Sequence, residues 1–178
     1  MTRWLLWLSA GLLLGGIVHL ASILIMPRTA TQDAFTRLEF TPVNAVSPPI
    51  PNAEEAVLPF MDPAFVHAAC RYDLSQGSLK LAVPISPSYT SVSFYSRNGV
   101  PYYAINDRAA GRRVIELELM TSEQRAELPE EEDVTSADRL IVESPSVSGI
   151  ILLKALAAEP GLTPAAQQAL AKAQCRPE

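Results

Sequence analysis

The stretch HAACRYDLSQGSLKLAVPI, from His67 to Ile85, decides the fold because two alternating segments flank a short polar turn. In the first segment Cys70 and Tyr72 fall on one face and Arg71 falls on the other, which is the two-residue period of a β-strand. A turn is expected at residues 75–77, and the second segment is expected to return from it as the partner strand. The sequence therefore predicts an antiparallel β-hairpin here.

Similar signals continue along the chain. Asn98-Gly99 is the strongest of them, because this dipeptide favours a tight hairpin turn between the strands expected at 92–94 and 102–106. The alternating segment RRVIELELM, residues 112–120, predicts a further strand, and DRLIVES, residues 138–144, predicts the last one.

Helical signals lie between and after these strands. Thr121 and Gln124 have the spacing of a capping box for a short helix that ends near Leu128. The apolar run at residues 146–161 is expected to be a buried helix, and Thr163-Pro164 is expected to cap a last helix that ends near residue 174. The predicted fold class is therefore α+β, an antiparallel β-meander covered by C-terminal helices.

The N-terminus predicts a single transmembrane helix in residues 1–28. No charged residue occurs from Trp4 to Met26, and about 23 helical residues at 1.5 Å each span roughly 35 Å, enough to cross a bilayer core. A cleaved signal peptide is the alternative, but a cut after Ala30 would place Arg28 at position −3, and a cut after Ala21 would place His19 there. An uncleaved anchor is the better interpretation.

This helix carries a stripe of small residues. Gly11, Gly15 and His19 are four residues apart, with Ser22 one turn further, so all four are predicted to contact a partner helix. Ionisable residues inside a membrane usually face protein, which favours the same interpretation of His19. A backbone hydrogen bond of His19, with glycines that are merely common in membrane helices, is the alternative.

Residues 29–61 are predicted to form a proline-rich linker before the domain at 62–178. Many of the fifteen prolines in the chain lie between Pro42 and Pro63. Such a segment either holds the domain off the membrane as a semi-rigid stalk or lies along the domain as an ordered arm. The cysteines and this spacer favour an exported domain, with the N-terminus inside.

The formal net charge of −5 and the absence of any Lys/Arg cluster argue against nucleic-acid binding. The sequence also lacks a phosphate-binding glycine loop and the G-x-S-x-G and H-E-x-x-H motifs. We therefore expect no catalytic site, no metal and no cofactor.

Cys70 and Cys175 are predicted to form a disulfide, since two cysteines in an exported domain most simply pair. A nucleophilic pair of Cys70 with His67 is the alternative, but these residues fall on opposite faces of a strand. A second cluster comprises aromatic and basic residues around the predicted hairpin, which either stack across strands or line a ligand groove. Its candidate groove residues are Tyr89, Tyr95, Arg97, Tyr102 and Arg108.

The segments RYDLSQG and SVSFYSRNG, with the N-terminal stretch GGIVHLASILIMPRTATQDAFTRL and the tail DRLIVESPSVSGIILLKALA, resemble bacterial membrane-anchored proteins with the domain of unknown function 1254. The resemblance implies a single-pass protein of the bacterial inner membrane whose C-terminal domain faces the periplasm. Such proteins are often encoded beside a membrane protein with the companion domain of unknown function 1214, which the resemblance implies as the partner. The chain departs from larger relatives, which have a segment similar to SPNNDTLYS where residues 47–63 stand here.

From these observations we expect a non-catalytic accessory subunit that contacts the bilayer and another membrane protein. The alternative is a binding module or weak enzyme that uses the Tyr/Arg region on a cell-envelope ligand.

Overall fold

The computed structural model describes residues 2–29, 33–50, 58, 60–110, 113–128 and 140–178, and the chain divides into two units, Met1–Asp33 and Ala34–Glu178. The first unit is helix α1 (Thr2–Thr29). Its stretch Thr2–Met26 is long and apolar enough to cross a membrane. Single-pass anchors and signal sequences share this property.

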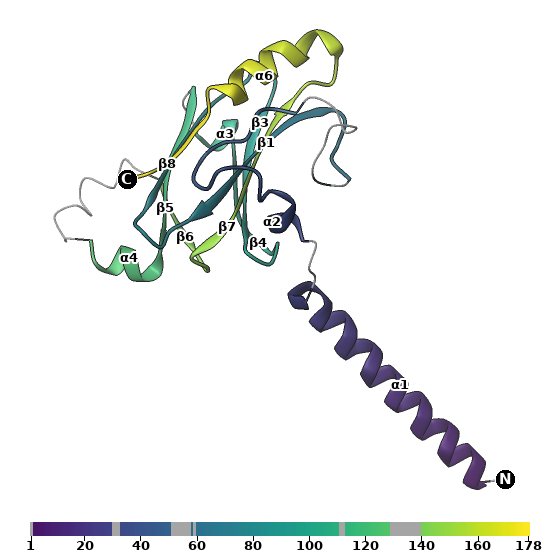
Figure 1. The fold of residues 1–178 in the computed structure, drawn as a ribbon. Helices are drawn as coiled ribbons and strands as arrows, with labels where there is room; N and C mark the ends of the chain where they lie inside the picture. Colours follow the sequence, from purple (N-terminus) through teal and green to yellow (C-terminus); the bar gives the residue numbers. More distant parts are fainter. Residues whose placement is uncertain (1, 30–32, 51–57, 59, 111–112, 129–139) are drawn as a thin grey trace. The chain divides into compact units, whose positions relative to one another are not determined.

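The second unit is a sandwich of two four-stranded sheets with a helix packed against the core (Figure 1). Sheet A has the strand order β1-β7-β3-β4, and sheet B has the order β6-β5-β2-β8. Every neighbouring pair is antiparallel except β5 and β6, which are parallel. The strands are β1 (Phe65–Asp73), β2 (Leu79–Pro84), β3 (Thr90–Ser96), β4 (Pro101–Asn106), β5 (Val114–Thr121), β6 (Leu140–Ser144), β7 (Ser148–Leu156) and β8 (Gln174–Pro177). The helices are α2 (Ala34–Arg37), α3 (Asp107–Ala110), α4 (Ser122–Ala126), η3 (Pro160–Leu162) and α6 (Thr163–Ala171). The α+β class is confirmed.

The core lies between the inner faces of the two sheets. Sheet A contributes side chains such as Phe94 and Leu153, and sheet B contributes Leu81 and Leu119, all fully or almost fully buried. Leu170 of α6 packs into the same cluster. Strands β2 and β3 bury alternate residues, so in these strands the period-two pattern of the sequence is the pattern of contact with this core.

Two local signals are confirmed, one for a turn and one for a helix cap. Asn98-Gly99 connects β3 and β4, and Gly99 has a φ of 77°, a backbone conformation that glycine adopts without steric cost. Thr121 and Gln124 form the predicted capping box at the start of α4. The Thr121 hydroxyl accepts from the Gln124 amide, and the Gln124 side chain accepts from the Thr121 amide.

The predicted pairing of β1 with β2 is wrong. β1 pairs with β7 in sheet A, whereas β2 pairs with β5 and β8 in sheet B. The turn after β1 therefore carries the chain from one sheet to the other. Apolar and polar residues alternate along β1 and β2 in the same way whether the two strands are hydrogen-bonded neighbours or face each other across the core. The alternation therefore does not specify which strand pairs with which.

The prediction of a helix at residues 146–161 is also wrong, because Ser148–Leu156 forms strand β7. This strand lies between β1 and β3 in sheet A, and most of its residues are buried. A central strand covered on both faces is apolar at nearly every position, and periodicity does not distinguish such a run from a buried helix.

The last helix is shorter than predicted. The residue before it, Leu162, occupies the N-cap position instead of Thr163, and no side chain caps the helix. The helix ends at Ala171, and residues from Gln174 form β8. A short 3-10 turn, η3, precedes it, as is common at helix N-termini.

Residues 34–50, which fall within the proline-rich segment, belong to the second unit and lie along it as an ordered arm. Isolated bridges join Val43 to Arg71, Val46 to Cys70 and Ile50 to His67. The arm therefore follows the free edge of β1. The rest of the predicted linker, residues 30–32, 51–57 and 59, lies outside the described residues.

Candidate functional site

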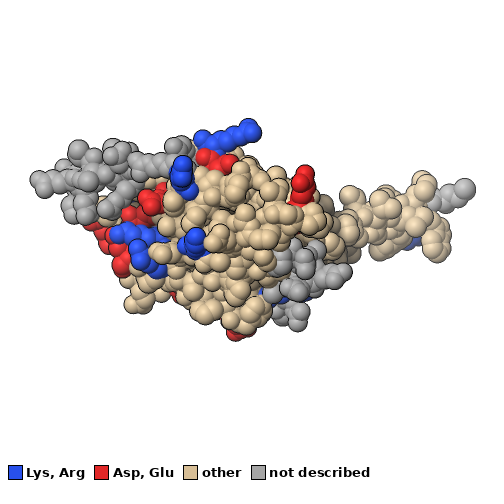
Figure 2. Space-filling model, turned by 90° about the horizontal axis from the view of Figure 1, so that it is seen from above, with Lys and Arg blue, Asp and Glu red and all other residues tan. Residues whose placement is uncertain are grey.

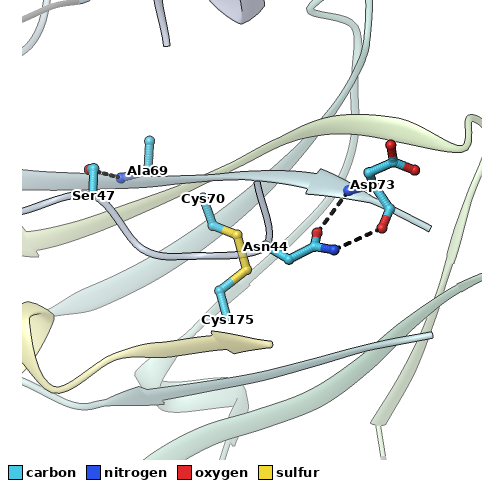
Figure 3. Close-up of a disulfide and its surroundings, with 6 residues drawn as sticks. All are labelled: Asn44, Ser47, Ala69, Cys70, Asp73 and Cys175. Carbon is cyan, nitrogen blue, oxygen red and sulfur yellow. Dashed lines mark hydrogen bonds between the residues drawn. A yellow bond between two sulfur atoms is a disulfide. The ribbon is translucent and has the colours of Figure 1, made fainter. Parts of the chain in front are cut away.

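The disulfide predicted from the sequence joins the two sheets. Cys70 lies in the middle of β1 at one edge of sheet A, and Cys175 lies in β8 at one edge of sheet B (Figure 3). Their Cα atoms are 6.5 Å apart, and both side chains are buried. The bond closes this side of the sandwich and leaves Cys70 without a free thiol, so a nucleophilic pair of Cys70 with His67 is not available.

The arm lies beside this disulfide and supplies the hydrogen bonds that a neighbouring strand would make. Ile50 and His67 exchange backbone bonds of 2.8 and 3.1 Å. The Ser47 amide donates to the Ala69 carbonyl at 2.8 Å, and its hydroxyl accepts from the Ala69 amide at 2.9 Å (Figure 3). The edge of β1 is therefore paired over these residues by the chain itself.

The Asn44 side chain continues the pairing at the end of β1. Its Oδ1 accepts from the Asp73 amide at 2.8 Å, and its Nδ2 donates to the Asp73 carbonyl at 3.0 Å (Figure 3). The Asn44 amide donates to the Arg71 carbonyl at 2.8 Å. Asn44 has a φ of 57°, a left-handed conformation that asparagine tolerates better than most residues. Sequence analysis did not single out Asn44 or Ser47, although an asparagine inside a proline-rich segment is a signal for a turn.

A groove of about 520 Å³ lies between the arm and the C-terminal segment. Its lining is mainly apolar, with polar side chains at Ser47, Gln174 and Arg176. The lining includes Val46, Pro48 and Pro49 of the arm and Leu170, Ala171, Ala173 and Cys175 of the C-terminal segment. Seen from the side of α6, charged side chains gather mainly at one side of the molecule, and much of the remaining face is uncharged (Figure 2). This groove could not be predicted from the sequence, because its two walls are more than a hundred residues apart.

His67 lies on the outer face of sheet A, opposite the face that carries Cys70. Its side chain is buried, and it is the register partner of Lys154 on β7. Burial, followed by the nearby Lys154 charge, lowers the pKa of His67 below its usual value, and Asp62 opposes this effect. His67 is therefore favoured in its neutral form.

The tyrosines of the predicted groove occupy separate environments. Tyr102 turns towards the interior, where its hydroxyl lies 3.1 Å from the hydroxyl of buried Tyr72. Tyr95 packs on the other face of the sheet against a small cluster that includes Ile150. Tyr89 stacks edge-on against Phe65, with ring centroids 6.3 Å apart.

The arginines of that predicted groove are also separated. The guanidinium of Arg97 lies 4.1 Å from the ring centroid of Phe35, next to α2. Arg71, which sequence analysis did not single out, lies 5.2 Å from the same ring. Arg108 is exposed on α3. The structure thus distributes the five predicted residues over both faces of sheet A and its loops, because neighbouring strand residues alternate between faces.

Tyr72 forms a buried polar network that sequence analysis missed. Its hydroxyl lies 2.9 Å from Ser144 Oγ, and it donates to the Tyr95 carbonyl at 3.4 Å. Burial raises the pKa of Tyr102, because a phenolate would lose its hydration there. A Cβ atom at Gly149 would overlap the Tyr72 hydroxyl and the Tyr95 carbonyl, so the network depends on glycine at this position.

Strand β4 is the other edge of sheet A. Within the described part of the chain, no strand pairs with its outer side. Its residues Pro101 and Ala104 are exposed, and the strand contains no charged residue. Alternate backbone amides and carbonyls of an edge strand point outward, so β4 offers a row of hydrogen-bonding groups.

The small-residue stripe lies on α1. Gly11, Gly15, His19 and Ser22 are exposed, and a Cβ atom at either glycine would meet no other described atom within 4 Å. The Ser22 hydroxyl donates to the Val18 carbonyl at 2.8 Å, within the helix. The contact of this stripe with another helix stays a prediction.

The chain matches a known family over most of its length. Residues 46–177 match the family described as "Protein of unknown function (DUF1254)". No curated protein matches the sequence.

Two solved structures align with most of this chain. The VPA0106 protein from Vibrio parahaemolyticus aligns with a TM-score of 0.58 at 13% identity, over 81% of this chain and 34% of that one. An uncharacterised protein from Burkholderia cenocepacia aligns with a TM-score of 0.48 at 15% identity, over 76% of this chain and 34% of its own. This chain therefore spans about a third of the length of these structures. On the evidence of the match over residues 46–177, the chain belongs to the DUF1254 family.

Proposed function

We propose that this protein is a membrane-anchored, non-catalytic partner subunit of an inner-membrane assembly. In this proposal α1 holds the chain in the bilayer, the sandwich lies in the periplasm, and β4 pairs with an extended segment of another membrane protein. The observation that carries the proposal is the difference between the two edges of sheet A.

The edge at β1 is covered by the arm, whereas the edge at β4 is open within the described residues. Natural proteins usually protect a sheet edge with charged side chains, prolines, bulges or a covering segment, because unpaired backbone groups recruit other strands. β4 has a proline at its first position and a register shift in its pairing with β3, at Phe94/Tyr95. Beyond that position it carries Tyr102, Tyr103 and Ile105 and no lysine. Such an edge suits a partner that adds a strand.

The disulfide supports the compartment in this proposal. Disulfides persist in oxidising environments such as the bacterial periplasm and are rare in the cytosol. With the domain exported, α1 crosses the bilayer and is available to other membrane helices. The stripe at Gly11, Gly15, His19 and Ser22 is then the intramembrane half of the interface. A protein of the DUF1214 type is the partner we propose for both halves.

Purification from native membranes tests the proposal. We expect the wild-type chain to co-purify with a second membrane protein in fixed proportion. Ala104→Lys should reduce the recovery of this companion, because an exposed edge lysine opposes strand addition. Gln168→Lys, at an exposed site on α6, is the matched control and should leave recovery unchanged. Equal recovery with both variants would contradict a role for β4.

A second candidate function rests on the groove beside the disulfide. Its volume of about 520 Å³ and its apolar lining fall in the range of small-molecule sites. In this alternative the domain is a binding module for an apolar cell-envelope ligand, held between the arm and α6. A ligand extracted from the purified protein, and lost in Ala171→Trp, would favour this function over the first.

A further inference from the structure

One end of the sandwich exposes large apolar side chains. Phe40 is 70% exposed, Val43 is 45%, Val100 is 60% and Val147 is 50%. Among the described residues of the domain, Phe60 is the one other exposed large apolar side chain, at 104%, and it is not part of this group. The end that carries Phe40, Val43, Val100 and Val147 is called the apolar end below.

Val43 and Val147 lie beside the end of β1, as their backbone pairings show. Val43 bridges to Arg71, two residues before that strand finishes. The Val147 carbonyl accepts from the Leu74 amide at 2.8 Å, immediately after the strand. Phe40 lies three residues before Val43, in the segment that follows α2.

The β3–β4 turn brings Val100 to the same end. The Val100 carbonyl accepts from the Ser96 amide at 2.9 Å, and Ser96 is the register partner of Gly149 at the start of β7. Val147 lies in the turn that leads into β7. Both turns are at the end of the sandwich opposite α6 (Figure 1).

Chain length connects this end to the membrane. Thr29 is the last residue of α1, and Ala34 is the first residue of α2, which leads directly to Phe40. Five Cα–Cα steps of about 3.8 Å span at most about 19 Å. If α1 is the anchor, as the proposed function requires, the start of α2 lies within that distance of the end of the membrane helix.

We propose that the apolar end rests on the lipid bilayer, with its exposed side chains in the headgroup region. Single exposed apolar residues are ordinary on a protein surface. Here four lie at one end of the domain, and the short chain between Thr29 and Ala34 keeps this end close to the membrane, which raises its effective concentration at the lipid surface. Apolar side chains bind at a membrane interface by burying their area there. Gln124 of α4 bonds the Leu74 carbonyl, so α4 adjoins this end as well. The exposed charges of the neighbouring segments have both signs: Arg37 and Arg125 are basic, and Glu39, Glu123, Glu127 and Glu143 are acidic. Anionic lipid is therefore not expected to strengthen the contact.

Spin labelling of the full chain in vesicles tests this proposal. Nitroxide labels are attached to cysteines introduced at Val100 and at Val147, both in exposed turns, while the native cysteines stay in their disulfide. The control label is at Gln168, exposed on α6 at the other end of the domain. A further label at Leu13 reports whether α1 is in the bilayer. Relaxation by oxygen marks lipid, and relaxation by a water-soluble nickel complex marks water.

With dilute protein in phosphatidylcholine vesicles, the labels at Val100 and Val147 should respond mainly to oxygen and the label at Gln168 mainly to nickel. Addition of phosphatidylglycerol should change neither result. If Val100 and Val147 respond to nickel as strongly as Gln168 while Leu13 is in lipid, the proposal fails and the anchor stands. If both labels are shielded from both reagents, protein covers the surface and the proposal fails. A water-exposed label at Leu13 would overturn the anchor, and with it the proposed function and this inference.

Discussion

The side chain of Asn44 bonds both the amide and the carbonyl of Asp73, 29 residues later in the chain, and so takes the place of a neighbouring strand residue. Ser47 and Ile50 extend this pairing along β1. The arm is thereby part of sheet A in its hydrogen bonding, although its proline-rich sequence gives no strand pattern. Within the described residues the arm covers this edge of sheet A, whereas no strand pairs with the outer side of β4 at the other edge.

Asn44→Ala should open the end of this edge. The substitution removes both side-chain bonds to Asp73 and leaves an alanine with a positive φ, so we expect a loss of about 1–3 kcal/mol in the free energy of unfolding. Hydrogen exchange of the Asp73 amide should accelerate, while the Ala69 amide stays protected. Ser47→Ala should give the reverse pattern. Equal acceleration at both amides in either variant would mean that the arm detaches as a unit.

Removal of the disulfide should destabilise the domain, but the domain should still fold. The bond closes a loop of 105 residues, for which the chain-entropy model gives up to about 4.7 kcal/mol and typical measurements give 2–4 kcal/mol. We expect Cys70→Ala combined with Cys175→Ala to lower the free energy of unfolding in urea by about 2–4 kcal/mol. An unchanged urea midpoint would show that the arm and the core already hold β1 and β8 together.

Gly149→Ala should lower the free energy of unfolding by more than the addition of one methyl group usually does. The added Cβ would overlap the Tyr72 hydroxyl and the Tyr95 carbonyl, and the carbonyl belongs to the backbone of a paired strand. We expect a cost of at least about 1–3 kcal/mol, measured by thermal or urea unfolding. Gly161→Ala is the control, because a Cβ atom there would meet nothing within 4 Å. If the two variants unfold alike, sheet A adapts at this point.

His67 should make stability depend on pH on the acidic side. Burial lowers its pKa in the folded state, so the unfolded chain binds a proton at a higher pH than the folded chain. The contribution is fully present above the unfolded pKa of about 6.5 and is lost as the pH falls below it. We expect His67→Gln to flatten the fall in stability between about pH 7 and pH 5, measured by urea unfolding at several pH values. An identical pH profile for the variant would exclude His67 as the source.

Two features of this fold that depend on neighbouring residues were predicted from the sequence. The turn at Asn98-Gly99 and the capping box at Thr121 depend on a few adjacent residues, and the structure contains both. The disulfide was predictable because only one pairing of two cysteines exists. Partners of strands depend on residues far away in the chain, and so the pairing of β1 with β7 was missed.

The candidate sites show the same division. Tyr95 and Tyr102 are close in sequence, which suggested a shared groove, but their strands turn them to different surroundings. The groove at the arm and the edge pairing by Asn44 join segments that are distant in sequence. Contact between such segments depends on how the two sheets pack, so a local sequence pattern does not predict it.

Photocrosslinking from β4 tests whether this edge of sheet A contacts a partner protein. A benzophenone amino acid is placed at Ala104 on β4, and in a separate variant at Gln168 on α6, and native membranes are irradiated. We predict one discrete adduct between the Ala104 variant and a second membrane protein, and no such adduct from Gln168. Absence of a protein adduct at Ala104, or the same adducts from both positions, would contradict the claim that β4 is where this subunit meets its partner.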